Sequence, residues 1–177
     1  MKHSVKILIL PLLVITILIS SCDLLNKNGN SDLPSGPQPL LEDTKWTMIA
    51  FEPTSGDRLE IDSTKTWPYL IYFNTDSTIK AQSYCNGLGG EFNSNYEQAS
   101  INIFSWGGTR SKCGWTVTFS DIMRSAHLYE VKDEYLYLYY SEAEYVLYSP
   151  EREEYEGSKE GRAIFRKGLG RYDDWLE

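Results

Sequence analysis

The distribution of hydrophobic and polar residues divides the chain into three parts. A run of 13 almost entirely apolar residues, 7–19, comes first, and a polar segment rich in Pro, Gly, Asn and Ser follows at residues 23–40. The remainder consists of short apolar segments separated by turn-forming residues. Such segments are typical of β-strands and hairpins. The pattern therefore predicts one mainly β domain that begins near residue 41.

The strand predictions depend on alternation and on the turns between segments. Trp46 and Met48 alternate with other residues in an opening strand, and the Asn-Thr-Asp-Ser sequence at residues 74–77 favours a hairpin turn. A glycine-rich turn is predicted at residues 86–90 and a further turn at 93–95. The predicted strands cover residues 41–51, 58–61, 69–73, 78–84, 91–93, 99–104, 135–140 and 145–148.

One segment has the spacing of an amphipathic helix. Phe119, Ile122, Met123 and Ala126 fall on one face of a helix predicted over residues 119–128, with Ser120 as its N-cap. We expect this helix to cover one end of the sheet. The predicted fold is therefore mainly β (α+β), a compact antiparallel sheet or barrel-like domain with a single helix.

The C-terminal part gives a weaker pattern. Residues 135–140 and 145–148 are predicted to pair, which ends the domain at residue 149. Residues 150–177 then form an acidic insert and a tail, in which five glutamates between residues 151 and 162 indicate a solvated segment. Residues 162–166 predict either one further strand or the true partner of residues 135–140.

The N-terminus has the features of a bacterial lipoprotein signal. Lys2 and Lys6 precede the apolar run, which is too short for the roughly 20 residues that a membrane-spanning helix requires. The sequence Ile-Ser-Ser-Cys at residues 19–22 resembles a lipobox. The resemblance implies removal of residues 1–21, a diacylglyceryl thioether on Cys22, and N-acylation, for instance with palmitate. An ordinary secretory peptide or an uncleaved anchor is the alternative.

Anchoring places the domain in a bacterial cell envelope, on the outer membrane if the cell is Gram-negative. Residues 22–40 then form a flexible, lipid-anchored linker, because their composition gives neither helix nor strand. The formal charge is −8, and loss of Lys2 and Lys6 would take it to −10. A protein this acidic, without a basic cluster, is not expected to bind nucleic acid.

Three short motifs resemble the META domain, also called the HslJ-like domain. Their order and spacing cover about residues 41–149. The resemblance implies a compact antiparallel β domain with one helix, as found in many bacterial envelope lipoproteins, some of them linked to heat shock or antibiotic resistance. It supplies no catalytic residues, and Tyr84 departs from the glycine that usually precedes the first cysteine. The motif residues are Leu41, Thr44 and Trp46; Cys85, Asn86, Gly90 and Phe92; and Thr109 and Cys113.

The remaining cysteines favour a disulfide. If Cys22 is lipidated, Cys85 and Cys113 are the two thiols left, in a compartment where disulfides persist. We expect the turns that carry them to face each other and to be joined by a structural bond. Two buried free thiols, or a redox or metal-binding pair, are the alternatives.

No catalytic or metal-binding constellation is evident. His127 alone remains after loss of the signal peptide, so a multi-histidine metal site is excluded, and no nucleophile motif accompanies it. Adjacent carboxylates such as Glu153 and Glu154 belong to a surface segment and not to an opposed catalytic pair. We therefore expect neither enzymatic activity nor a cofactor.

The tyrosine-rich strand is the strongest candidate for binding. Tyr135, Tyr137 and Tyr139 project to one face of a strand, with leucines on the other. Either this face packs under another part of the chain, or it recognises a partner. The sequence thus predicts a membrane-anchored envelope protein that binds a protein or small ligand or supports stress tolerance. The alternatives are a structural or assembly component, and an enzyme or enzyme inhibitor acting on envelope polymers.

Overall fold

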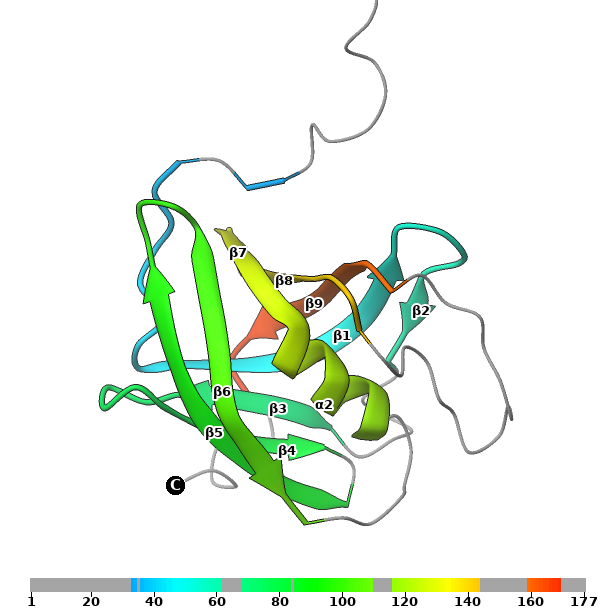
Figure 1. Cartoon of the computed structure of the whole chain (residues 1–177), viewed down its shortest axis with the longest axis horizontal. Coiled ribbons are helices and arrows are strands. Elements are labelled where there is room, and N and C mark those ends of the chain that lie inside the picture. Colours follow the sequence, from blue (N-terminus) through cyan, green and yellow to red (C-terminus); the bar gives the residue numbers. More distant parts are fainter. Residues whose placement is uncertain are drawn as a thin grey trace, which may run out of the picture. The chain divides into compact units, whose positions relative to one another are not determined.

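The computed structural model describes residues 33–34, 36–61, 68–83, 85–109, 116–143 and 159–169. The chain divides into two compact units, Met1–Leu33 and Pro34–Glu177, and the second carries the fold (Figure 1). Its described residues form nine strands and one helix. These are β1 (Thr44–Pro53), β2 (Leu59–Glu60), β3 (Tyr69–Phe73), β4 (Thr78–Ser83), β5 (Asn86–Asn95), β6 (Ser100–Gly108), α2 (Thr116–Ser125), β7 (Ala126–Lys132), β8 (Tyr135–Tyr140) and β9 (Gly161–Lys167).

The strands form one antiparallel sheet that closes on itself. Neighbours follow the order β1-β3-β4-β5-β6-β7-β8-β9, and β9 then pairs with β1, so eight strands make a barrel. β1 has three partners because residues 44–47 pair with β3, residues 50–51 pair with the extra strand β2, and its other edge pairs with β9. The predicted fold class, mainly β and barrel-like with one helix, is confirmed for the described residues.

The barrel interior is filled by apolar side chains that alternate with outward-facing residues. In β8, for example, Leu136 and Leu138 belong to the core cluster. Several aromatic rings meet edge to face, as in the pair Phe73 and Phe92, whose centroids are 4.9 Å apart. The largest fully buried side chains are Trp46, Tyr69, Tyr129, Tyr140, Phe51, Phe73, Phe92, Phe119, Phe165, Leu41, Met48 and Leu70.

The helix α2 packs against the barrel as predicted, but its predicted boundaries are wrong. Phe119, Ile122 and Met123 are fully buried, and the Phe119 ring lies 6.2 Å from that of Trp106. The helix begins at Thr116, so Ser120 lies inside it and is not the N-cap. It ends at Ser125, because the following residues pair with β8 as the strand β7. Pairing of β7 with the next strand, β8, in a hairpin overrides the helical periodicity of these residues.

The predicted turns at residues 86–90 and 93–95 are also wrong. β5 runs without interruption from Asn86 to Asn95, and the chain turns at residues 96–99. The glycines are accommodated in the strand by a bulge, since the β5–β6 register shifts between Gly89 and Glu91. Glycine in a strand often marks such a bulge and not a turn.

The last strand lies outside the predicted domain boundary. β9 pairs with β8 and with β1, and thereby closes the barrel. Of the two readings of residues 162–166, the pairing with residues 135–140 is confirmed. The predicted pairing of residues 135–140 with 145–148 is wrong, because β7 and β9 occupy both edges of β8. Residues 145–148 lie outside the described residues.

The segment before β1 is held against the barrel. The Gln38 amide N–H donates to the Tyr96 carbonyl at 2.7 Å, and the Val131 N–H donates to Gln38 Oε1 at 3.0 Å. The Tyr129 hydroxyl donates to the Pro39 carbonyl at 3.1 Å. The end of the predicted linker therefore belongs to the folded unit. Among the described residues, no helix has the length and apolar character needed to cross a membrane.

Candidate functional site

The opening motif is a local hydrogen-bonded unit. The Thr44 hydroxyl donates to the Leu41 carbonyl, and the Trp46 indole N–H donates to Thr44 Oγ1 at 2.8 Å. Both Leu41 and Trp46 are buried in the core. Thr44 thus satisfies the polar atom of a buried indole, which explains why these three residue types occur at this spacing.

The two later motifs lie side by side at one end of β5 and β6. Asn86 opens β5 and Thr109 follows β6, and the Thr109 hydroxyl donates to Asn86 Oδ1 at 2.7 Å. The Thr109 N–H also donates to the Gly87 carbonyl at 3.1 Å. Asn86 is completely buried. Because a buried amide requires hydrogen-bond partners, we interpret Asn86 and Thr109 as structural residues that fasten this end of the barrel.

Glycine is required at two positions of this region for steric reasons. A Cβ atom on Gly90 would lie 2.9 Å from the Phe104 carbonyl oxygen and 3.1 Å from the Trp106 ring. A Cβ atom on Gly108 would lie 2.2 Å from the Gly87 carbonyl oxygen. The motif glycine Gly90 therefore allows the two strands to approach and Trp106 to turn inward.

Of the three cysteines, only Cys85 lies among the described residues. Cys85 directly precedes β5, is exposed, and is disulfide-bonded. Cys113 and Cys22 lie outside the described residues. The pairing of Cys85 with Cys113, and lipidation of Cys22, therefore remain predictions.

The three tyrosines of β8 share one face, as predicted, and this face is the outer one, but they are exposed to different degrees. Tyr135 is 37% exposed, Tyr137 is half-buried, and Tyr139 is only 6% exposed. The Tyr135 and Tyr137 rings lie 6.5 Å apart. The Tyr139 hydroxyl donates to Glu130 Oε2 on β7 at 3.1 Å, and burial raises the pKa of Tyr139. Only the first two tyrosines therefore offer surface to a partner.

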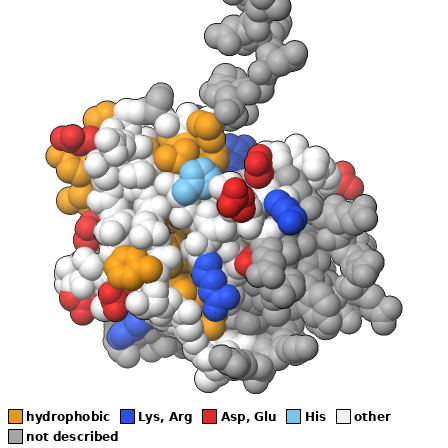
Figure 2. All heavy atoms as spheres, in the orientation of Figure 1, with side chains coloured by type: hydrophobic (Ala, Val, Ile, Leu, Met, Phe, Trp, Pro, Cys, Tyr) orange, Lys and Arg blue, Asp and Glu red, His pale blue; other side chains and the backbone are white. Residues whose placement is uncertain are grey.

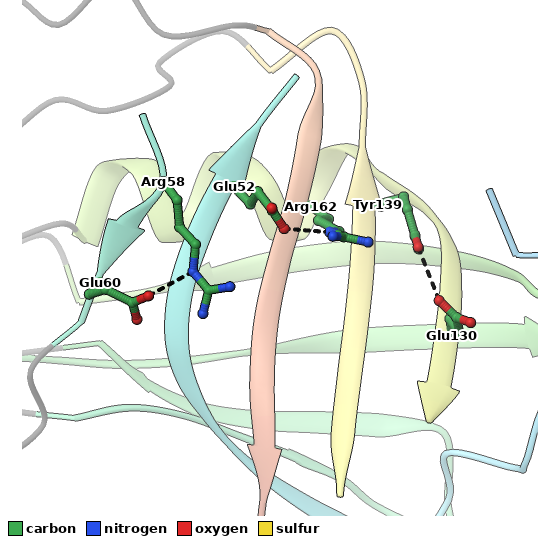
Figure 3. A network of polar contacts seen from close by, with 6 residues as sticks. All are labelled: Glu52, Arg58, Glu60, Glu130, Tyr139 and Arg162. Atoms are coloured by element: carbon green, nitrogen blue, oxygen red, sulfur yellow. Dashed lines mark hydrogen bonds and ion pairs between the residues drawn. The ribbon is translucent and has the colours of Figure 1, made fainter. Parts of the chain in front are cut away.

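A network of polar side chains crosses this outer face (Figure 3). Arg162 of β9 donates through Nε to Glu52 Oε2 of β1 at 2.6 Å. Its guanidinium carbon lies 5.1 Å from the centre of the Tyr137 ring. The hydrogen bond that Arg162 donates to Glu52 raises the pKa of Arg162 above its usual value, so the guanidinium stays charged. Figure 3 also shows Arg58 beside Glu60, at 2.7 Å, toward the β2 side of the same face.

Two apolar side chains on the outside of the barrel lie near Arg162 in the strand register. Ile164 is 3% exposed and Ala50 is fully buried, although both alternate with residues of the core cluster. The register places Ile164 between Ala50 and Tyr137. The half-buried pair of Arg162 and Tyr137 thus lies where it can shield these side chains from water. Sequence analysis missed this arrangement because Glu52 and Arg162 are 110 residues apart.

The single histidine outside the predicted signal peptide lies just beyond the helix in which it was predicted. His127 is exposed on β7, and its Nδ1 is 3.4 Å from the Ser141 hydroxyl oxygen. Within the described ranges, no group of three or more His, Cys, Asp or Glu side chains is placed to hold a metal ion. The exposed aromatic surface around Tyr135 and Tyr137 is the candidate site considered below.

Comparison with known proteins finds solved structures similar to this chain but no match in sequence. No family model and no curated protein matches the chain. A protein from Burkholderia xenovorans, determined by NMR, is 15% identical with a TM-score of 0.48 and covers 81% of this chain and 97% of its own. A DUF4847 family protein from Bacteroides vulgatus is 14% identical with a TM-score of 0.49 and covers 72% of this chain and 94% of its own.

Proposed function

We propose that the chain is a non-enzymatic lipoprotein of a bacterial cell envelope, anchored through lipidated Cys22. Its β domain is META-like (HslJ-like) and binds a protein partner through the outward tyrosines of β8. The signal and lipobox sequences support the anchor, and the contact between Asn86 and Thr109 supports the family resemblance. The observation that carries the binding role is the outward pair Tyr135 and Tyr137.

The neighbours of Tyr135 also support a binding surface. Cross-strand partners place Lys132 of β7 on one side of Tyr135 and Arg166 of β9 on the other, and both are exposed. Tyrosine gives a large contact area at low entropic cost, and Tyr and Arg are enriched in protein interfaces. Tyr139 is not part of this surface, because its ring is buried and its hydroxyl is hydrogen-bonded.

Photo-cross-linking in intact cells tests the binding role. A photoreactive phenylalanine analogue at position 135 is expected to capture one envelope protein. The same analogue at Tyr96, which is 46% exposed in the turn after β5, is the matched control and should capture none. The Tyr135→Ser/Tyr137→Ser variant should lose the partner while keeping its folded spectrum. Capture that is equal at both positions, or none at position 135, would refute this surface as the binding site.

A separate measurement tests the anchor. Metabolic labelling with an alkynyl fatty acid should label the wild-type chain and place it in the membrane fraction, and Cys22→Ala should abolish both. A labelled chain without a partner at Tyr135 would leave the lipoprotein assignment intact and would favour the structural or assembly role. An unlabelled chain would remove the anchor from the proposal.

A further inference from the structure

A row of basic and aromatic side chains crosses three neighbouring strands on the outside of the barrel. Tyr135 of β8 pairs directly with Lys132 of β7 on one edge and with Arg166 of β9 on the other. Directly paired residues of an antiparallel sheet direct their side chains to the same face, so all three project outward, and all three are exposed. Neighbouring strands lie about 4.8 Å apart, so the backbone positions of the two basic residues are about 10 Å apart, with the tyrosine between them.

The two basic side chains of this row have no carboxylate partner in the described part of the chain. Neither Lys132 nor Arg166 forms an ion pair there. That includes the carboxylates nearest in sequence, those of Asp133 and Glu134 in the turn between β7 and β8. The row therefore presents two cations to an outside partner, on a chain whose formal charge is −8.

Two other arginines of the outer surface are paired within the molecule. Arg162 contacts Glu52 at 2.6 Å and Arg58 contacts Glu60 at 2.7 Å (Figure 3). On the face of the domain that Figure 2 shows, basic side chains are scattered among acidic and uncharged ones. A long polyanion needs a broad basic surface, whereas two cations beside a tyrosine suit a short acidic segment.

We propose that the row of Lys132, Tyr135 and Arg166 recognises an acidic segment of a partner protein, in which an apolar side chain lies between two carboxylates. This inference rests on the function proposed above and adds the chemistry of the partner. One carboxylate would pair with Lys132 and the other with the planar guanidinium of Arg166, and the apolar side chain would pack on the tyrosine ring. In an extended peptide, residues i, i+2 and i+4 face one side over about 13 Å, which long basic side chains can reach by leaning outward.

Two other occupants fit the row less well. In a symmetric contact between two copies of the chain the same surface meets itself, which would bring like charges of the two rows together. A lone anion such as phosphate would pair with a cation but would leave the exposed ring of Tyr135 without a contact. Charge complementarity together with the central ring therefore favours a peptide segment.

Selection from a displayed random peptide library on the full chain, purified in detergent, tests the chemistry of the partner. The selected peptides should be enriched in Asp and Glu, and replacing these by Asn and Gln should weaken binding at least about tenfold. In the ¹⁵N-labelled chain, a bound peptide should shift the amide resonances of Tyr135 and Arg166. The inference would be overturned by failure to select any peptide, by peptides without acidic enrichment, or by peptides that leave these resonances unchanged.

Charge reversal with a matched control locates the effect. Lys132→Glu/Arg166→Glu should bind the acidic peptides at least about tenfold more weakly and should select basic peptides instead. Lys132→Gln/Arg166→Gln is the milder variant and should weaken the acidic peptides without selecting basic ones. Arg124→Glu/Lys159→Glu changes the net charge as much as the reversal does, at exposed residues near the end of α2 and just before β9, and should keep the acidic peptides. Equal losses in the reversal and this control would overturn the inference.

The charge-reversal variant also separates this inference from the proposed function. In cells, the photoreactive analogue at position 135 should no longer capture the partner when Lys132 and Arg166 are replaced by Glu. Capture that persists would keep the partner and overturn the acidic segment. Selected acidic peptides without any capture in cells would support the chemistry of the row and count against the proposed partner. Glycerol 3-phosphate that displaces the peptides at equal concentration would assign the row to a lone anion and overturn the inference.

Discussion

The buried hydroxyl of Tyr140 makes a testable prediction about alkaline stability. The residue is 1% exposed, its hydroxyl has no hydrogen-bond partner among the described residues, and burial raises its pKa to about 12. Below about pH 10 the folded and unfolded chains both keep the proton. Between about pH 10 and 12 the unfolded chain releases it first, so the free energy of unfolding falls as the pH rises.

The size of this loss of stability follows from the difference between the pKa of Tyr140 in the folded and in the unfolded chain. A rise from 10.0 to about 12 corresponds to about 3 kcal/mol, at about 1.4 kcal/mol for each pH unit. Tyr140→Phe should remove this loss. At neutral pH the same change should be neutral or raise the free energy of unfolding by about 1 kcal/mol, because it removes an unsatisfied buried polar group.

Urea unfolding measured at a series of pH values from about 7 to 12 provides the assay. The wild-type chain and Tyr140→Phe should diverge above about pH 10. The free energy of unfolding of Tyr140→Phe should still fall somewhat with rising pH, since burial also raises the pKa of Tyr129 and of Tyr139. Tyr96→Phe is the control, because that tyrosine is exposed and its removal should leave the profile unchanged. A constant difference between wild type and Tyr140→Phe across the whole range would refute the reasoning.

Three further predictions concern packing and polar contacts. Gly161→Ala should lower the free energy of unfolding, measured by urea unfolding, by about 2–3 kcal/mol, since the added Cβ would lie 2.5 Å from a carbonyl oxygen of β1. Gly107→Ala is the control. Its Cβ would have no atom within 4 Å among the described residues, so the free energy of unfolding should change by less than about 1 kcal/mol. Asn86→Ala should lower the free energy of unfolding by about 1–2 kcal/mol, because it removes the hydrogen bond with Thr109. In a double-mutant cycle with Thr109→Val the two losses should be coupled, and strictly additive losses would contradict the hydrogen bond. Arg162→Met should lower the free energy of unfolding by about 1 kcal/mol at low salt and by less at high salt, because salt screens the ion pair with Glu52. A loss that does not depend on salt would assign the effect to packing alone.

The strand pattern and the direction of side chains were predictable because both depend on local spacing. Alternation placed Leu136 and Leu138 on one face and Tyr135 and Tyr137 on the other, and the barrel has the leucines inside and the tyrosines outside. The predicted hairpin of residues 69–73 and 78–84 corresponds to the paired strands β3 and β4. In a strand, successive side chains point to opposite faces whatever the neighbouring strands are, so sequence alone carries this information.

Boundaries were less predictable where a tertiary partner competed with a local preference. The apolar spacing that extended the predicted helix to residue 128 also fits a strand, and pairing with β8 decides in favour of β7. Similarly, the glycines near Gly90 favour a turn by composition. They lie in a bulged strand because β6 pairs along them and requires close approach.

The sequence by itself determined a mainly β domain, the alternation of side chains between the two faces of its strands, and the motifs that contain Asn86 and Thr109. The tertiary structure decided the closure of the barrel by β9 and the pairing of Arg162 with Glu52 on its outer face. The physical reason is sequence separation. Contacts between residues about 110 apart leave no periodic signal in either segment, and which edges remain unpaired depends on the register of every strand at once.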